Sequence, residues 1–398
     1  MITYSRVIWL LALVSLLTDI SSEMLYPVMP FYLKQIGFSM LVIGCLEGLA
    51  EALAGLSKGY FGQVSDLTGK RVSFIRGGYL LSALAKPLLA VSPWIFWVFG
   101  ARLLDRLGKG LRTAPRDALL SSQATPQTQG QVFGLHRGMD TLGAVIGPVF
   151  ALGFLLLWPG LYQGLFLLAF IPASLGVSLT FLLKDSPHRS LASQTKQVIP
   201  FWGYFSYWEK ATPGYRRLVA PMLFFGLMNA SDAFLLLRAQ QLGWSENGVI
   251  ALYIGYNLLY ALAALPVGHL ADQLGMRRLL QVGLLLFSAV YAGFAWNQQK
   301  EILWLLFAVY AIYAACNESL VKAWISKITP EHERGTALGF YVSLSSLMAL
   351  LASVLAGVLW QMLSPVWPFA ISASGALLVW VWMVWQGPHI PEQRVIQG

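Results

Sequence analysis

Charged side chains recur within long apolar stretches of this sequence. Asp19 and Glu23 stand four residues apart, as do Glu47 and Glu51, so each pair would share one face of a helix. The stretch 93–121 carries five basic and two acidic residues. Charge in apolar surroundings is costly and marks functional candidates. The candidate proton-coupling or cavity residues are Asp19, Glu23, Glu47, Glu51, Arg102, Asp105, Arg106 and Lys109.

A buried carboxylate beside an arginine can exchange a proton when the two groups separate. Desolvation raises the pKa of a carboxyl group and a neighbouring guanidinium lowers it, so breaking the pair changes its proton affinity. Separating Asp19 or Glu23 from the arginines of 93–121 would therefore move a proton. A static ion-pair network that only holds helices together is the alternative. Asp105, with basic residues three and four positions away, is expected to be a permanent partner of its neighbours.

A second polar set occurs in the other half of the chain. The residues there that are most able to face a cavity are Asn229, Asp232, Asn257, Asn317, Glu318 and Lys322. Glu318 and Lys322 are four apart and could neutralise each other. Aromatic residues such as Tyr26, Phe31, Tyr253 and Tyr256 would suit an organic solute, although aromatic rings also pack helices together.

The composition is that of a membrane protein. Hydrophobic residues form 57% of the 398-residue chain and charged residues 11%, with a mean hydropathy of +0.62. Segments long enough to cross a bilayer are predicted at 7–33, 40–65, 72–92, 93–121, 131–157, 160–183, 217–239, 246–270, 278–296, 301–327, 336–360 and 366–386. Because backbone groups in lipid must be paired internally, an all-α polytopic membrane protein is expected.

Catalytic and metal-binding patterns are not found in the sequence. The five histidines are scattered, the two cysteines have no metal-ligand spacing, and no phosphate-binding Gly-x-x-x-x-Gly-Lys loop occurs. We therefore expect no enzyme activity, no catalytic or metal residues, and no cofactor beyond a proton as coupling ion.

The chain contains an internal repeat. Residues 62–71 (GQVSDLTGKR) and 268–277 (GHLADQLGMR) share a Gly, an Asp four residues on, and a Gly three further. The same offset of 206 relates 35–39 to 241–245. The repeat predicts two copies of one structural unit. These are an N-terminal six-helix bundle at 1–183 and a C-terminal six-helix bundle at 217–398, joined by a cytoplasmic linker at 184–216.

The basic residues predict the orientation. With a cytoplasmic N-terminus, fourteen of them fall on the inner side and only Lys34, Arg238 and Lys300 on the outer side. Both termini are then cytoplasmic in a multi-pass protein of the cell inner (plasma) membrane. The net charge of +9 is explained by cytoplasmic loops, so no nucleic acid partner is expected.

The repeated loops resemble the signature loop of the major facilitator superfamily, with Leu67 where a basic residue is usual. Their role would be a conformational latch, formed by Gly62, Asp66, Gly69, Lys70, Arg71, Gly268, Asp272, Gly275 and Arg277. Asp66 could accept hydrogen bonds from the first amides of a neighbouring helix, and Gly69 permits a tight turn. A plain cytoplasmic turn is the alternative.

Two further motifs support this resemblance. Residues 106–114 (RLGKGLRTA) resemble the family's Arg-xx-Gln-Gly motif, with Lys109 replacing the glutamine. The stretch 131–157 resembles the family's antiporter motif through Gly134, Gly143, Gly147 and Pro148. With Gly138 these glycines form a small-residue stripe that favours close helix packing. His136 and Asp140, four apart, could form a proton-responsive pair.

Residues 18–27 and 105–117 resemble, more narrowly, a prokaryotic branch of drug-exporter-like permeases. The resemblance implies twelve transmembrane helices in two pseudo-symmetric six-helix bundles. It also implies that carboxylates of the first two helices face the arginines of the fourth. A monomer would suffice, since one chain holds both halves. Its expected partners are a small-molecule substrate and the lipid bilayer.

Secondary active transport by alternating access is the function that these features favour. Proton-coupled antiport, exporting a small organic solute, is the first hypothesis because of the glycine motif. Proton-coupled import of an anionic nutrient or metal chelate is the alternative, suited by the excess positive charge of 93–121. A membrane-embedded enzyme and a receptor that no longer transports are less favoured.

Overall fold

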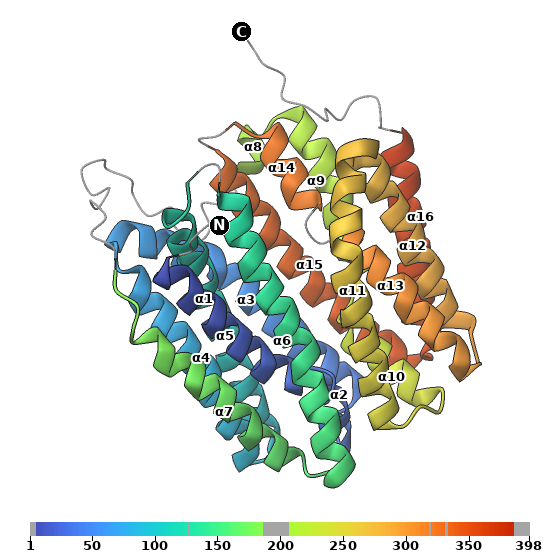
Figure 1. The fold of residues 1–398 in the computed structure, drawn as a ribbon. Helices are drawn as coiled ribbons and strands as arrows, with labels where there is room; N and C mark the ends of the chain where they lie inside the picture. The colour runs from blue at the N-terminus through green and yellow to red at the C-terminus, as the bar shows by residue number, and fades with distance from the viewer. Residues whose placement is uncertain (1–4, 126–127, 186–206, 318–319, 331–332, 386–398) are drawn as a thin grey trace. The chain divides into compact units, whose positions relative to one another are not determined.

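The computed structural model describes residues 5–125, 128–185, 207–317, 320–330 and 333–385, and every regular element in these ranges is a helix (Figure 1). The first helices are α1 (Arg6–Leu25), α2 (Met29–Gln35), α3 (Met40–Thr68), α4 (Arg71–Val91), α5 (Ile95–Ser122), α6 (Gln129–Leu157) and α7 (Tyr162–Thr180). The later ones are α8 (Tyr207–Lys210), α9 (Pro213–Gly226), α10 (Ala233–Gln241), α11 (Glu246–Leu274), α12 (Met276–Trp296), η3 (Lys300–Ile302), α13 (Leu303–Asn317), α14 (Leu320–Ile328), α15 (Arg334–Met362) and α16 (Val366–Trp385).

Within the described residues, ten helical segments are long and apolar enough to cross a membrane. The two other predicted spans are also helical. One is α5, whose seven charged residues lower its hydropathy, and the other is divided into α9 and α10 by residues 227–232. Both departures from an ordinary apolar span coincide with polar residues that the sequence marks as functional candidates.

The chain divides into two compact units. The first comprises Met1–Phe38 and Leu49–Val198, and the second comprises Ser39–Gly48 and Ile199–Gly398. The division near residue 198 falls inside the linker predicted at 184–216, of which 186–206 lie outside the described residues. The first residues of α3 group with the second unit, which the predicted boundary at 183 does not anticipate.

The sequence repeat is visible in the backbone. Gly37 and Gly243, one offset apart, have φ of +91° and +100°, and Gly69 and Gly275 have φ of +69° and +86°. Such left-handed conformations favour glycine, which has no Cβ. The long helices between these turns, α3 and α11, each have 29 residues. The helices that follow, α4 and α12, each have 21. Equivalent glycines thus end equivalent helices in the two copies.

Close glycine contacts hold α4 against α5 in the first unit. A Cβ built on Gly78 would lie 2.6 Å from the carbonyl oxygen of Gly108, and one built on Gly108 would lie 2.5 Å from that of Gly78. Such contacts allow only glycine at both positions. They bring the charged face of α5 against α4 and position the ion network described next.

Candidate functional site

A buried ion network joins α4 to α5. Lys86 is only 2% exposed, and its Nζ lies 2.7 Å from Oδ1 of Asp105. Arg102 Nη1 lies 3.9 Å from the other carboxylate oxygen, and Lys86 also reaches Ser22 Oγ of α1 at 3.5 Å. A buried charge needs such partners, because removing one partner leaves the other uncompensated. Asp105 is therefore a fixed ion-pair partner, and Lys86 is the cation that sequence reasoning did not connect to it.

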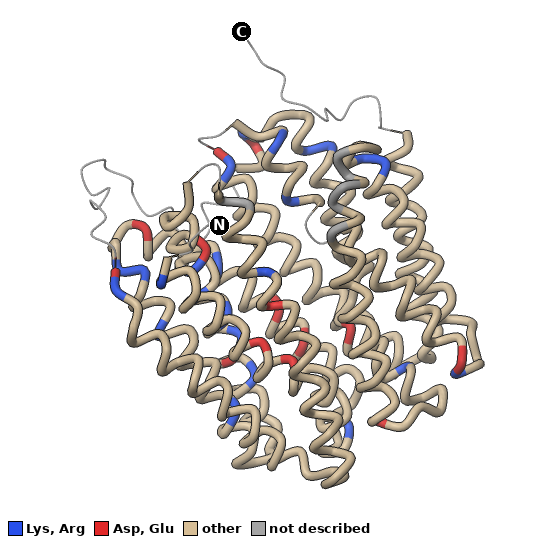
Figure 2. Tube along the Cα trace, viewed as in Figure 1, with Lys and Arg blue, Asp and Glu red and all other residues tan. Residues whose placement is uncertain are grey.

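The next turns of α5 are also tied to neighbouring helices. Arg112 is buried and donates from Nη1 to Ser82 Oγ at 2.6 Å. Its guanidinium carbon lies 4.6 Å from the ring centroid of Tyr79, within cation–π range. Arg116 pairs with Asp117 of the same helix at 2.8 Å and donates from Nη1 to Ser15 Oγ of α1 at 3.4 Å. Figure 2 shows charged positions recurring along the helices of the first unit and not only at their ends.

The carboxylates of α1 lie where α6 packs closely against α1. Asp19 and Glu23 are both half-buried. A Cβ built on Gly143 would lie 2.8 Å from the Cβ of Asp19, and one built on Gly147 would lie 2.5 Å from the carbonyl oxygen of Ile20. The glycine motif of α6 thus packs directly on the turn that carries both carboxylates.

The rest of the glycine stripe is different. A Cβ built on Gly134 or Gly138 would meet no atom of the described residues within 4 Å. Close packing is therefore confined to Gly143 and Gly147, and Pro148 follows within the same helix. On either side of Gly138, His136 Nδ1 lies 3.4 Å from Asp140 Oδ2, so the i,i+4 pair is formed.

The other members of the predicted proton-coupling set lie on α3 and α5. Glu47 is buried and Glu51 is exposed. Arg106 is buried and Lys109 is exposed. The predicted pairing of the α1 and α3 carboxylates with the α5 arginines stays a prediction.

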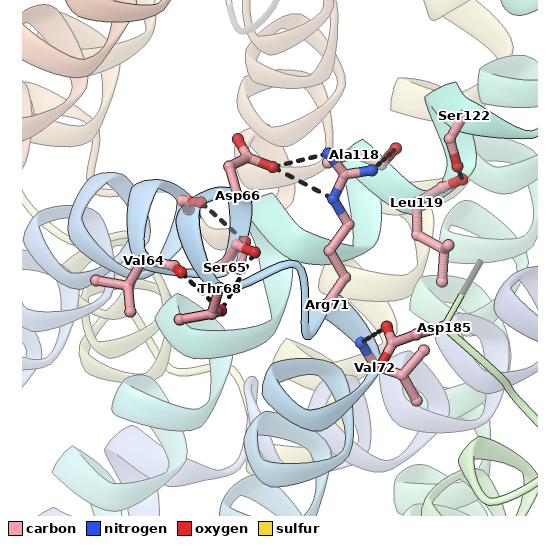
Figure 3. A network of polar contacts seen from close by, with 11 residues as sticks. Val64, Ser65, Asp66, Thr68, Arg71, Val72, Ala118, Leu119, Ser122 and Asp185 are labelled. Atoms are coloured by element: carbon pink, nitrogen blue, oxygen red, sulfur yellow. Dashed lines mark hydrogen bonds and ion pairs between the residues drawn. The ribbon is translucent and has the colours of Figure 1, made fainter. Parts of the chain in front are cut away.

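The predicted latch contains an ion pair at the turn between α3 and α4 (Figure 3). Arg71 donates to Asp66 Oδ1 from Nη2 at 2.8 Å and from Nε at 3.2 Å. Its Nη1 reaches the carbonyl oxygen of Ala118 on α5 at 3.4 Å. The two side chains are 20% and 52% exposed, and exposed pairs of this kind contribute about 0.2–1 kcal/mol. The pair links three helices while remaining easy to break.

Asp185, which lies beyond α7 in the chain, accepts a hydrogen bond from a backbone amide at the start of α4. Its Oδ1 receives the backbone N–H of Val72 at 2.8 Å, in the first turn of α4 (Figure 3). The sequence assigned that role to Asp66, which instead pairs with Arg71. Gly62 makes a close approach, since a Cβ there would lie 2.8 Å from that of Ala114. Lys70 is exposed before α4.

The second copy of the latch lies partly within the described residues. Gly275 has the left-handed turn and Arg277 is half-buried at the start of α12. The surroundings of Gly268 and of the Asp272 side chain lie outside what the structure describes, as do residues 318–319, which include Glu318. Lys322 is exposed on α14.

The second unit brings its polar residues against tyrosines. Asp232 Oδ1 accepts from the hydroxyl of Tyr310 at 2.6 Å, and Asn229 Oδ1 accepts from Tyr291 at 3.5 Å. Asn317 donates to the hydroxyl of Tyr313 at 3.0 Å.

The second-half candidates include one further buried residue, Asn257 on α11. Of the aromatic candidates, Phe31 is a core residue at 2% exposure, whereas Tyr26 and Tyr256 are half-buried. Sequence reasoning missed Tyr310 and Tyr313, although they share the i,i+3 spacing of Tyr253 and Tyr256.

Known proteins resemble the whole chain. The family model of the Major Facilitator Superfamily matches residues 11–237 and 217–395. An uncharacterized MFS-type transporter of Methanocaldococcus jannaschii is 34% identical over 390 residues, covering 95% of both chains. A Lactococcus lactis homolog of the multi-drug resistance efflux pump PmrA is 23% identical over 361 residues, covering 85% of this chain and 84% of that protein.

Solved structures share the fold. A POT family transporter crystallised with 5-aminolevulinic acid superposes with a TM-score of 0.80 at 15% identity, covering 97% of this chain and 96% of the other. At that identity the likeness shows the fold alone. The family match and the archaeal relative span nearly the entire sequence, and such relatives are transporters rather than enzymes. This chain belongs to the Major Facilitator Superfamily and has the fold of its membrane transporters.

Proposed function

We propose that this transporter is a proton-coupled antiporter that exports a small organic solute across the cell inner membrane. It would act as a monomer with both termini cytoplasmic, and the proton would be its only coupling species. The L. lactis relative is described as a multi-drug resistance efflux pump homolog, which agrees with export.

The observation that carries the proposal is the contact between the α6 glycines and the turn of α1 that carries Asp19 and Glu23. Gly143 packs against the backbone of Leu16 and the Cβ of Asp19, and Gly147 packs against the turn of Ile20 to Met24. With no side chain between them, α1 and α6 must move together or slide along a tightly fitted surface. A movement of α6 is thereby transmitted to the carboxylates.

The proton would be carried by Asp19 or Glu23. Each is half-buried on the same face of α1, so a small displacement changes its hydration and its distance from the buried cations of α5. Both changes alter how tightly a carboxylate holds a proton. Binding of the proton and of the solute in alternation would drive antiport.

The Lys86–Asp105 pair would serve a different purpose. Its 2.7 Å contact joins α4 to α5 and involves a nearly inaccessible lysine. Such a pair holds two helices in one rigid body. Movement would then occur between this rigid body and the closely packed α1–α6 pair, and at the latch of Asp66 and Arg71, where breaking an exposed ion pair costs little free energy.

Inside-out vesicles with an acid lumen test the proposal. Candidate solutes are added singly, and a trapped pH-sensitive dye reports proton efflux. We expect solute-dependent efflux that is lost in Asp19→Asn or Glu23→Gln and retained in Asp185→Asn, where an asparagine can still cap α4. Uptake driven by an inward proton gradient in right-side-out vesicles, with no efflux in the first assay, would favour import instead.

A further inference from the structure

The interruption between α9 and α10 places a carboxylate beside a group of tyrosines in the second unit. Helix α9 ends at Gly226 and α10 begins at Ala233, and the intervening residues carry Asn229 and Asp232. Broken membrane helices frequently form solute sites, because they expose polar groups at the depth where the solute passes. The polar groups of this break are fixed by other helices.

Asp232 is turned away from its own helix. It occupies the N-cap position of α10 but makes no side-chain hydrogen bond to the amides there. Its carboxylate instead accepts from the hydroxyl of Tyr310 on α13 at 2.6 Å. A residue type that usually caps a helix is thus held toward the aromatic cluster.

Tyr310 lies in a layered group of rings. Its centroid lies 5.5 Å from that of Tyr256 on α11, 5.4 Å from Tyr313 on α13 and 6.2 Å from Tyr291 on α12. Tyr291, Tyr310 and Tyr313 are buried, whereas Tyr256 is half-buried. The buried rings therefore support an outer face made by Tyr256, Asp232 and Asn229.

The chemistry of that face is selective for charge. Aromatic faces carry negative potential and attract cations, and a carboxylate adds a full negative charge. The N-terminus of α10 contributes a partial positive charge of roughly half a unit, which reduces but does not cancel that of Asp232. An organic cation is attracted by the ring faces and by the Asp232 carboxylate, whereas both repel an organic anion.

We propose that Asp232 and Tyr256, supported by the buried rings of Tyr291, Tyr310 and Tyr313, bind the cationic group of the solute. That group is an organic ammonium or phosphonium ion. This inference rests on the proposed transport function and specifies its substrate class. Asn229, held by Tyr291 at 3.5 Å, supplies a polar contact beside the cation.

Equilibrium binding to the full-length protein in lipid nanodiscs tests the inference. Labelled tetraphenylphosphonium is the probe, with empty nanodiscs giving the lipid background. We expect saturable binding that phenyltrimethylammonium displaces and benzenesulfonate, an anion of similar size, does not. Absence of saturable binding, or equal displacement by the anion, overturns the inference without any variant being made.

Variants then locate the site. We expect Asp232→Asn to raise the Kd for tetraphenylphosphonium at least about tenfold, because a charge-assisted contact is lost. Tyr256→Leu should raise it severalfold through loss of the ring face, and Glu333→Gln, a carboxylate outside the group, should leave it unchanged. An unchanged Kd in folded Asp232→Asn overturns the assignment. If that variant does not fold, Tyr256→Leu decides by the same criterion.

The binding and flux experiments distinguish a failure of the cationic substrate class from a failure of the antiport proposal. Binding is measured at equilibrium without a proton gradient, so cation binding that depends on Asp232 supports the site even where no solute moves protons. Proton efflux with anionic or neutral solutes, together with absent cation binding, retains antiport and overturns the substrate class.

Discussion

Replacing Gly147 by alanine should disturb the contact on which the proposed coupling depends. The added Cβ would lie 2.5 Å from the carbonyl oxygen of Ile20 and 2.8 Å from the amide nitrogen of Met24. The first distance is about 0.9 Å below the 3.4 Å at which ordinary contact begins, and both atoms belong to backbone that cannot rotate away. Helix α1 must therefore move.

The cost of that movement can be estimated. Forcing a methyl group into a filled interior typically costs about 1–3 kcal/mol. Gly138→Ala is the matched control on the same helix, because a Cβ there meets no atom of the described residues within 4 Å. Replacing glycine by alanine improves helix propensity equally at both positions, so this contribution to stability cancels when the two variants are compared.

Thermal unfolding and proton flux together measure the effect. We expect the unfolding midpoint of Gly147→Ala to lie about 1–4 °C below that of Gly138→Ala. Solute-dependent proton flux should fall about tenfold, equivalent to 1.4 kcal/mol in the barrier, while Gly138→Ala stays near wild type. Equal midpoints and equal fluxes in the two variants would refute the reasoning from close packing.

Three further variants probe the latch, the buried arginine and the cap. Asp66→Asn should slow transport with a stability loss of under about 1 kcal/mol, since the Asp66 side chain is 52% exposed; unchanged transport rates would exclude the latch. Arg106→Ala should abolish coupled transport while the protein remains in the membrane, and wild-type flux in that variant would remove Arg106 from the coupling set. Asp185→Ala should cost about 1 kcal/mol by leaving the amide of Val72 without its acceptor; an unchanged unfolding midpoint would contradict the cap.

Local sequence signals predicted the helices, the turns and the repeat. Gly69 and Gly275 have the positive φ that their place in the repeated loop requires. His136 and Asp140 meet as their i,i+4 spacing predicts, because helical geometry alone sets that contact.

Contacts between helices could not be predicted in the same way. Lys86 of α4 forms an ion pair with Asp105 of α5, and this contact depends on how the two helices are rotated about their own axes. Asp232 and Tyr310 are separated by 78 positions in the chain. Hydropathy reports which residues are apolar but not which faces meet, so these partners emerge only from the packed fold.

The coupling of solute to proton is the central claim, and a solute gradient alone tests it most directly. Proteoliposomes are loaded with a transported solute that has no titratable group, then diluted into solute-free buffer at equal pH with the membrane potential clamped. Antiport predicts that the lumen becomes more acidic as solute leaves, and that Asp19→Asn or Glu23→Gln abolishes the change. Alkalinisation of the lumen, or solute loss with no pH change, would contradict antiport.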